Sequence, residues 1–205
     1  MPNPNRRLIA VVLDRSGSMH SVKADTEGGL RAFLAAQHEA PGETTVSLYQ
    51  FDTHYEAVYE NTPLAEVPAF ELHPRGGTAL LDAIGYTVGG VGEQLAAMDE
   101  DDRPGEVVLV ILTDGQENSS REYTLARVKE LLTAKQADDG WVVVFLGADQ
   151  DAFTVGAGMG VAAGTTLSYS GRRTAETWTT SGEMVARGSK TGRYGFTDGE
   201  RDATS

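Results

Sequence analysis

The chain has 205 residues, of which 40% are hydrophobic and 23% are charged, so it can form a real core and is not a disordered chain. Its net charge of -13 argues against a nucleic-acid partner, because such binding depends on Lys and Arg that displace counterions from phosphates. The absence of cysteine excludes disulfides, zinc sites with thiolate ligands and thiol nucleophiles.

The N-terminal segment predicts neither a secretion signal nor a membrane span. Only the apolar residues 8–13 precede Asp14, which is too short a run for either. We therefore expect a cytoplasmic protein with no membrane partner.

The same apolar run predicts a strand that is buried on both faces. It leads directly into Asp14-Arg15-Ser16-Gly17-Ser18, which brings one carboxylate and two hydroxyls to the end of the strand. In open α/β sheets, ligands bind where such strands end at their carboxyl side. Asp and Ser also form polar turns that bond only their own backbone, so this stretch alone leaves both interpretations open.

A helix and a hairpin are expected next. Residues 21–38 have apolar side chains at helical spacing, and Gly28-Gly29 within them indicates either close packing on the sheet or simple tolerance. Residues 44–51 and 55–60 predict two antiparallel strands at a sheet edge. We interpret Asp52 and His54, in the turn between them, as surface turn residues.

A long connection, residues 61–77, is expected to return the chain to the end of the sheet where Asp14 lies. It ends in Gly76-Gly77-Thr78, before a helix predicted to reach about Met98. Thr78 either caps this helix or adds a third hydroxyl to a site at this edge.

The second half of the chain continues the alternation of strands and helices. Residues 107–112 predict a buried strand that ends at Thr113-Asp114-Gly115, so a second carboxylate leaves the sheet. The remaining segments are a helix at 119–137 with Leu125 facing inward, a strand at 141–146, a short helix at 152–160 and a strand at 165–170. This order predicts an α/β fold, doubly wound, with a mostly parallel sheet and one antiparallel edge strand.

We expect one domain over residues 1–170 and a C-terminal extension over residues 171–205. In the extension, residues 174–187 predict a weak helix, and the chain after Gly188 is expected to be a frayed tail because it lacks an apolar face.

Three separate segments thus deliver oxygen atoms to one end of the sheet. All are hard donors and none is His or Cys, which favours Mg²⁺ or Mn²⁺ over zinc or copper. If the hydroxyls bind directly and the carboxylates act through water, the ion remains a strong Lewis acid that seeks an anionic ligand, such as an Asp or Glu of a partner protein. The candidate metal ligands are Asp14, Ser16, Ser18, Thr78 and Asp114.

On these residues the sequence resembles the von Willebrand factor A (VWA) domains and their integrin relatives. Asp14-x-Ser16-x-Ser18, Thr78 and Asp114 match that family's metal-ion-dependent adhesion site (MIDAS), and the resemblance spans roughly residues 6 to 170. It implies a Rossmann-like fold and a divalent cation completed by a partner's carboxylate. It is closest to intracellular bacterial or phage members, which often work beside AAA-type ATPases, chelatases or tellurium-resistance (stress-resistance) proteins.

Two other function classes stay open. One is a metal-dependent hydrolase or phosphotransferase, although Ser16 stands where phosphatases of that type carry an acid-base Asp. The other is a structural component of a larger assembly. The binding module, without catalytic residues, is the leading hypothesis.

Four neighbouring residues receive interpretations of their own. Arg15 and Met19 are candidate partner contacts, and Glu117 is interpreted as an exposed loop charge. Asp82 either orients metal ligands or stabilises the start of its helix.

Overall fold

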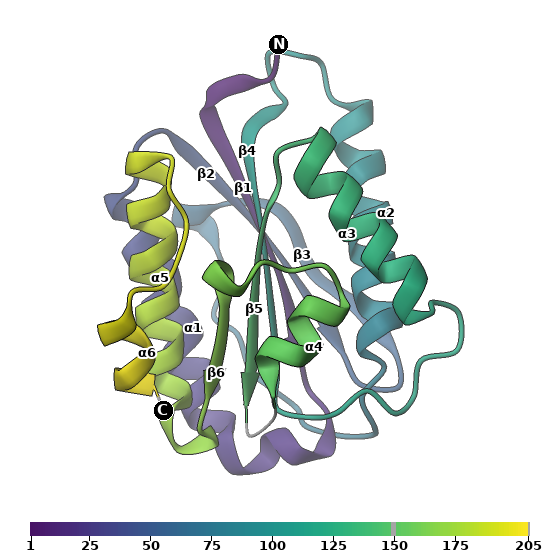
Figure 1. Ribbon diagram of the computed structural model, residues 1–205. Helices are drawn as coiled ribbons and strands as arrows, with labels where there is room; N and C mark the ends of the chain where they lie inside the picture. The colour runs from purple at the N-terminus through teal and green to yellow at the C-terminus, as the bar shows by residue number, and fades with distance from the viewer. Residues whose placement is uncertain (149–150, 205) are drawn as a thin grey trace.

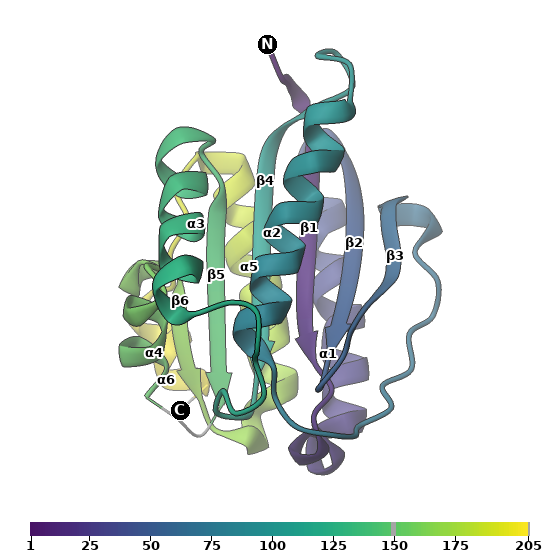
Figure 2. The same ribbon diagram turned by 90° about the vertical axis from the view of Figure 1, so that its right-hand side faces the viewer.

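The computed structural model describes residues 1–148 and 151–204. Ser205, the last residue of the expected extension, lies outside them. Six strands form one sheet in the order β3-β2-β1-β4-β5-β6 (Figures 1 and 2). All neighbouring strands are parallel except β2 and β3, which form the antiparallel hairpin. The strands are β1 (Asn3–Asp14), β2 (Glu43–Phe51), β3 (Tyr55–Pro63), β4 (Pro104–Thr113), β5 (Val142–Ala148) and β6 (Thr166–Tyr169).

Helices cover both faces of this sheet, as Figures 1 and 2 show. One face carries α2 (Leu80–Ala97), α3 (Leu125–Asp138) and α4 (Ala152–Gly158), and the other carries α1 (Lys23–Ala36), α5 (Thr174–Thr191) and α6 (Asp198–Thr204). The predicted doubly wound α/β fold with an antiparallel edge strand is therefore confirmed. Among the helices of residues 1–148 and 151–204, none has the length and apolar character needed to cross a bilayer.

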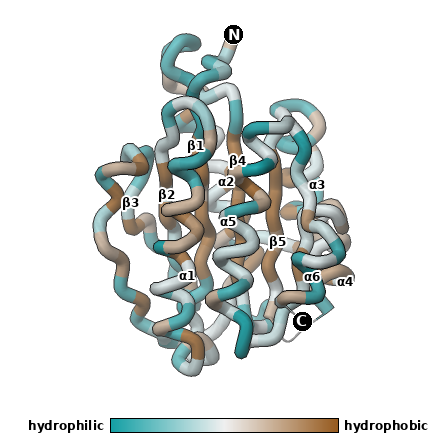
Figure 3. The backbone as a smooth tube through the Cα atoms, turned by 90° about the vertical axis from the view of Figure 1, so that its left-hand side faces the viewer, coloured by the Kyte–Doolittle hydropathy of each residue, from teal (hydrophilic) through white to brown (hydrophobic). Residues whose placement is uncertain are grey.

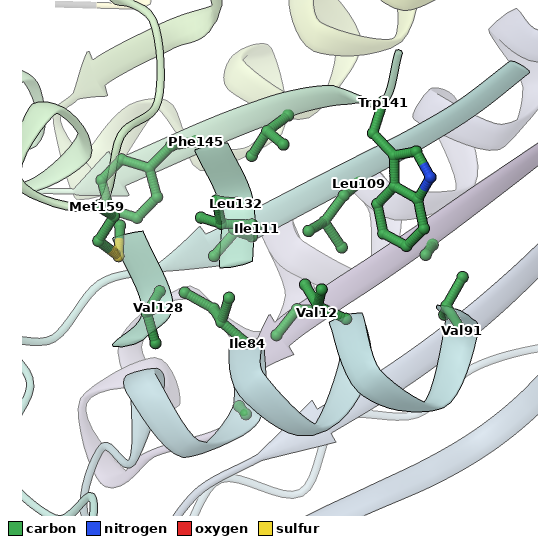
Figure 4. Close-up of a cluster of buried hydrophobic side chains, with 14 of the residues drawn as sticks. Val12, Ile84, Val91, Leu109, Ile111, Val128, Leu132, Trp141, Phe145 and Met159 are labelled. Carbon is green, nitrogen blue, oxygen red and sulfur yellow. The ribbon is translucent and has the colours of Figure 1, made fainter. Parts of the chain in front are cut away.

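The core has two halves, one on each face of the sheet. Side chains on a strand alternate between faces, so β1 sends Leu8, Ala10 and Val12 into one half and Ile9, Val11 and Leu13 into the other. Figure 3 shows the central strands as the most hydrophobic part of the chain, and Figure 4 shows the half beneath α2 and α3. Burial on both faces explains why β1 and β4 read as continuous apolar runs.

The C-terminal segment contains the helix expected over residues 174–187 but not the frayed tail expected after Gly188. The helix is α5, of 18 residues, whose Trp178 is fully buried and meets Phe33 of α1 edge to face, with ring centroids 5.6 Å apart. It looked weak in the sequence because much of its buried face is small or polar. Gly182 lies so close to α1 that an added Cβ would be 2.8 Å from the Phe33 Cα.

The end of the chain is also tied down. Arg187 of α5 forms a two-pronged ion pair with Glu200 of α6, at 2.6 and 3.1 Å. Arg201 donates to the carbonyl of Thr166 in β6 at 2.7 Å. These contacts replace the apolar anchor whose absence suggested fraying.

Gly28 and Gly29 offer a matched pair of substitutions in α1. A Cβ on Gly29 would lie 2.5 Å from the Trp178 Cδ1, whereas a Cβ on Gly28 would approach only Arg31, at 4.0 Å. The close packing expected at this pair is therefore found at Gly29, but against α5 and not against the sheet.

We expect Gly29→Ala to lower the free energy of unfolding by about 1–3 kcal/mol, because overpacking outweighs the gain in helix propensity. Gly28→Ala should raise it by up to about 1 kcal/mol, because only the propensity gain applies there. Urea unfolding of both variants measures the difference, and equal effects of the two substitutions would contradict the packing described above.

Candidate metal centre

The candidate centre lies at the carboxyl edge of the sheet, toward which β5 points at the lower end of Figure 1. β1 and β4 are neighbours with Leu13 opposite Leu112, so Asp14, the last residue of β1, and Asp114, the first residue after β4, lie near each other at this edge. The three loops that carry the predicted ligands meet here. The Gly17 N–H donates to the carbonyl of Gly76 at 3.2 Å, and the Arg75 N–H donates to the carbonyl of Arg15 at 2.8 Å.

Asp14 is fully buried and both of its carboxylate oxygens accept hydrogen bonds. The Ser16 N–H donates to Oδ1 at 2.6 Å, and the Thr113 hydroxyl donates to Oδ2 at 2.6 Å. Burial raises the pKa of Asp14 to about 6, against the opposing effect of these hydrogen bonds, and the nearby Asp114 adds to the rise. Thr113 stands directly before Asp114 in the sequence but was not among the predicted site residues.

Hydroxyls connect the first loop to Asp114. Ser16 Oγ lies 3.0 Å from Ser18 Oγ, and the Ser18 hydroxyl donates to Asp114 Oδ1 at 2.6 Å. The structure thus brings together four of the five predicted ligands, Asp14, Ser16, Ser18 and Asp114, in one hydrogen-bonded group.

Thr78, the fifth, is buried and reaches the centre through the loop after Asp114. Its Oγ1 would be 2.7 Å from a Cβ added to Gly115, so only glycine fits there without a shift. Its N–H donates to Asn118 Oδ1 at 2.9 Å, and its carbonyl accepts from the Asn118 N–H at 3.0 Å. Thr78 does not cap α2, because the N-cap residue is Ala79, so that alternative is wrong.

Asp52 fixes two of the three loops to each other. Its Oδ2 accepts from Arg15 Nε at 2.8 Å and from Arg75 Nε at 2.9 Å, and only 1% of the residue is exposed. Although burial raises its pKa, the hydrogen bonds from Arg75, the His54 N–H and Arg15 outweigh this and hold the pKa of Asp52 well below its usual range. We call this arrangement of Asp52, Arg15 and Arg75 the Asp52 clamp.

Three of the sequence-based interpretations, those of Asp52, Arg15 and Met19, were wrong. Asp52 is a buried ion-pair partner and not a surface turn residue. Arg15 and Met19, the candidate partner contacts, are both buried, Arg15 in the clamp and Met19 in the core on the α1 side. Asp and Arg at loop positions suggested exposure, but a carboxylate that accepts from two guanidinium groups can be buried.

The loop after Asp114 is bound to the start of α2 from both sides. Glu117 Oε2 accepts from the Leu81 N–H at 2.9 Å, and Ser120 Oγ accepts from the Asp82 N–H at 3.1 Å. These bonds satisfy N–H groups that a helix leaves unpaired in its first turn. Glu117 is therefore a helix-capping residue and not the exposed loop charge that was expected.

Asp82, in the first turn of α2, accepts hydrogen bonds from the same loop. Its two oxygens accept from the backbone N–H groups of Arg121, Glu122 and Tyr123, at 2.7–2.9 Å. These bonds explain Asp82 better than either predicted role, metal-ligand orientation or stabilisation of its own helix. Residues 121–123 are thereby held in a non-helical conformation, and α3 begins at Leu125, later than the predicted start at 119. Leu125 was expected to face inward, but it is 48% exposed.

The donor set of this centre consists of oxygen atoms alone. In residues 1–148 and 151–204, no group of three or more His, Cys, Asp or Glu side chains gathers in a way that could hold a metal ion. The candidate centre has two carboxylates and takes its other oxygens from hydroxyls. Such donors suit Mg²⁺ or Mn²⁺, and a cation would offset the charge repulsion that adds to the raised pKa of Asp14.

The sequence matches no family model and no curated protein, but the fold is similar to several solved structures. A von Willebrand factor type A protein from Catenulispora acidiphila is 15% identical with a TM-score of 0.62, over 88% of this chain and 42% of that one. The ArnB paralog VWA2 from Sulfolobus acidocaldarius is 16% identical with a TM-score of 0.57, over 84% and 44%. Proximal thread matrix protein 1 from the mussel byssus is 14% identical with a TM-score of 0.60, over 91% and 47%.

These identities show the fold alone. The chain spans less than half the length of each of these structures.

Proposed function

We propose that this chain, which has the von Willebrand factor type A fold, binds a partner protein through a divalent metal ion. Asp14, Ser16, Ser18, Thr78 and Asp114 would hold Mg²⁺ or Mn²⁺, and an Asp or Glu of the partner would complete the site. The observation that carries the proposal is the meeting of oxygen donors from three separate loops around the buried Asp14. The ion supplies a Lewis acid that accepts the partner's carboxylate.

The chain's own residues prepare this site. The Thr113 hydroxyl and the Ser16 N–H orient the two oxygens of Asp14, and the Asp52 clamp holds the Ser16 loop beside the Gly76-Gly77-Thr78 loop. Three of the five donors are neutral hydroxyls. With these bound directly and Asp14 and Asp114 acting through water, little negative charge would touch the cation. An acidic partner residue is the ligand that this residual charge favours.

We further propose that the domain binds and does not catalyse. Both oxygens of Asp14 are already engaged by Thr113 and Ser16, and Ser16 replaces the second carboxylate that a phosphatase of this kind needs. Turnover of a generic phosphoester that is abolished by Asp14→Asn would overturn this part of the proposal. A cytoplasmic setting stays a prediction from the N-terminal sequence. A bacterial or phage origin and a partner among AAA-type ATPases or stress-resistance complexes stay predictions from the resemblance.

The metal site is tested by calorimetric titration of the protein with Mg²⁺ and with Mn²⁺. We expect saturable binding by the unmodified chain and at least a tenfold loss in Ser16→Ala, because second-sphere changes alone already cost about 10–100-fold in metal affinity. Ser21→Ala is the matched control. Its hydroxyl lies in the same loop but donates to the Ser18 carbonyl at 3.3 Å, away from the carboxylates.

Circular dichroism must show that both variants keep the fold. The proposal is wrong if neither metal gives a heat of binding or a thermal stabilisation with the unmodified chain. Equal losses of metal affinity in Ser16→Ala and Ser21→Ala would show that the Ser16 hydroxyl has no specific role in metal binding.

A further inference from the structure

A hollow opens beside the candidate metal centre, between the tip of the β2–β3 hairpin and the start of α2. Its volume is about 690 Å³, and its lining includes Thr53, Tyr55, Asp82, Tyr86, Asn118 and Glu122. Asn118 belongs to both places, because its side chain also accepts from the Thr78 N–H at 2.9 Å. The hairpin hollow therefore adjoins the candidate metal centre, within reach of a partner segment bound there.

Two tyrosines, Tyr55 and Tyr86, line the hairpin hollow, and they belong to a row of packed aromatic rings. Tyr55 stacks on Tyr49 with ring centroids 5.6 Å apart and meets Tyr86 at 5.4 Å, and Tyr86 meets Tyr123 edge to face at 5.4 Å. The Tyr55 hydroxyl lies 3.0 Å from the Thr87 hydroxyl, which fixes the ring from α2. The row presents preorganised aromatic surface, and aromatic faces attract cations.

The charges around the hollow favour the same ligand. The exposed carboxylate of Glu122 acts on the Tyr86 hydroxyl and raises the pKa of Tyr86 to about 12. Asp82 adds a second negative charge at the floor, where it is fixed by three backbone N–H groups. Arg121 and His54 also line the hollow. With His54 neutral, the two carboxylates outnumber the one guanidinium, so the lining keeps a net charge of -1.

We propose that the hairpin hollow is a second anchor point for the partner and receives one of its lysine or arginine side chains. The inference rests on the metal-dependent function proposed above, and it specifies the partner as a segment with both an acidic and a basic residue. The acidic residue binds at the metal centre, and the basic residue lies against Tyr86 and pairs with Glu122. Such two-point recognition fixes the direction of the segment as well as its position.

A random dodecapeptide library displayed on phage, bound in Mg²⁺ and eluted with EDTA, tests this proposal. We expect the eluted peptides to be enriched in Asp or Glu, with Lys or Arg at a constant offset from it. The selection is repeated on Glu122→Gln, on Ser16→Ala, and on Glu93→Gln. The last is the matched control, because it removes an exposed carboxylate from α2 that does not line the hollow.

The two proposals fail in distinguishable ways. Glu122→Gln should keep the acidic enrichment, lose the basic one and bind a selected peptide about fivefold to tenfold more weakly, as expected for one exposed ion pair with a cation–π contact. Acidic enrichment with no basic residue, or a basic preference that survives in Glu122→Gln, would overturn the anchor and leave the metal function standing. The selection on Ser16→Ala measures how many acidic peptides are recovered without an intact metal site. If the unmodified chain yields no more than this, both proposals are wrong.

Discussion

Asp52→Ala should lower the free energy of unfolding by about 3–5 kcal/mol, the range found when one partner of a buried ion pair is removed. The substitution leaves the Arg15 guanidinium buried, with Gln50 and Glu56 as its remaining side-chain partners among residues 1–148 and 151–204, and removes the partner of Arg75 Nε. It also removes the side-chain link between two of the loops that form the metal centre. Urea unfolding measures the first effect and Mg²⁺ titration measures the second.

Glu56→Ala is the matched control for the clamp. Glu56 also pairs with Arg15, at 2.5 Å, but its side chain is 55% exposed, so its removal should cost no more than about 1 kcal/mol. A loss of Mg²⁺ affinity in Asp52→Ala but not in Glu56→Ala, under conditions where both are folded, would separate loop positioning from general stability. Similar small losses in both variants would show that the clamp contributes little.

The clamp also predicts a pH dependence. Because the pKa of Asp52 is depressed in the folded state, its contribution is complete above its unfolded value of about 4 and is lost as the pH falls toward the folded value. The difference in unfolding free energy between the unmodified chain and Asp52→Ala should therefore shrink below about pH 4.

Trp178→Ala should lower the free energy of unfolding by about 3–5 kcal/mol, as for other fully buried aromatic residues. Its ring packs into the space left by Gly29 and against Phe33, and so joins α5 to α1. Trp178→Phe should cost much less. It keeps an aromatic ring and removes an Nε1 that is buried without a hydrogen-bond partner within residues 1–148 and 151–204.

Chemical denaturation monitored by far-UV circular dichroism compares the two Trp178 variants. If Trp178→Ala unfolds at the same urea concentration as the unmodified chain, α5 is only an appendage to the domain. A cost in Trp178→Phe equal to that in Trp178→Ala would show that the indole nitrogen, and not ring volume, matters.

The sequence predicted the elements that follow simple periodicity. The continuous apolar runs of β1 and β4 identified a sheet covered on both faces, and the position of Asp14 and Asp114 after those strands placed both carboxylates at one edge. Order along the strand is local information, so a single sequence is enough to reveal it.

The features that the sequence did not reveal depend on contacts between distant segments. Asp52 looked like a turn residue, because nothing in its neighbourhood along the chain shows that Arg15 and Arg75 converge on it. Glu117 accepts from the Leu81 N–H, and Asp82 accepts from the Glu122 N–H, each across about 40 positions of sequence. Both cases involve side chains that bond to backbone or charge far away, for which no periodic pattern exists.

The reciprocal bonds between α2 and residues 117–123 also bear on how the chain can vary in length. Glu117 and the N–H groups that Asp82 accepts lie at fixed counts after Asp114, so an insertion of one residue would carry several of these groups out of reach. The connection before Gly76 is different, because Leu72 and Arg75 pin it at few points. Insertions and deletions should therefore be tolerated in that connection, whereas the loop that delivers Asp114 must keep its length.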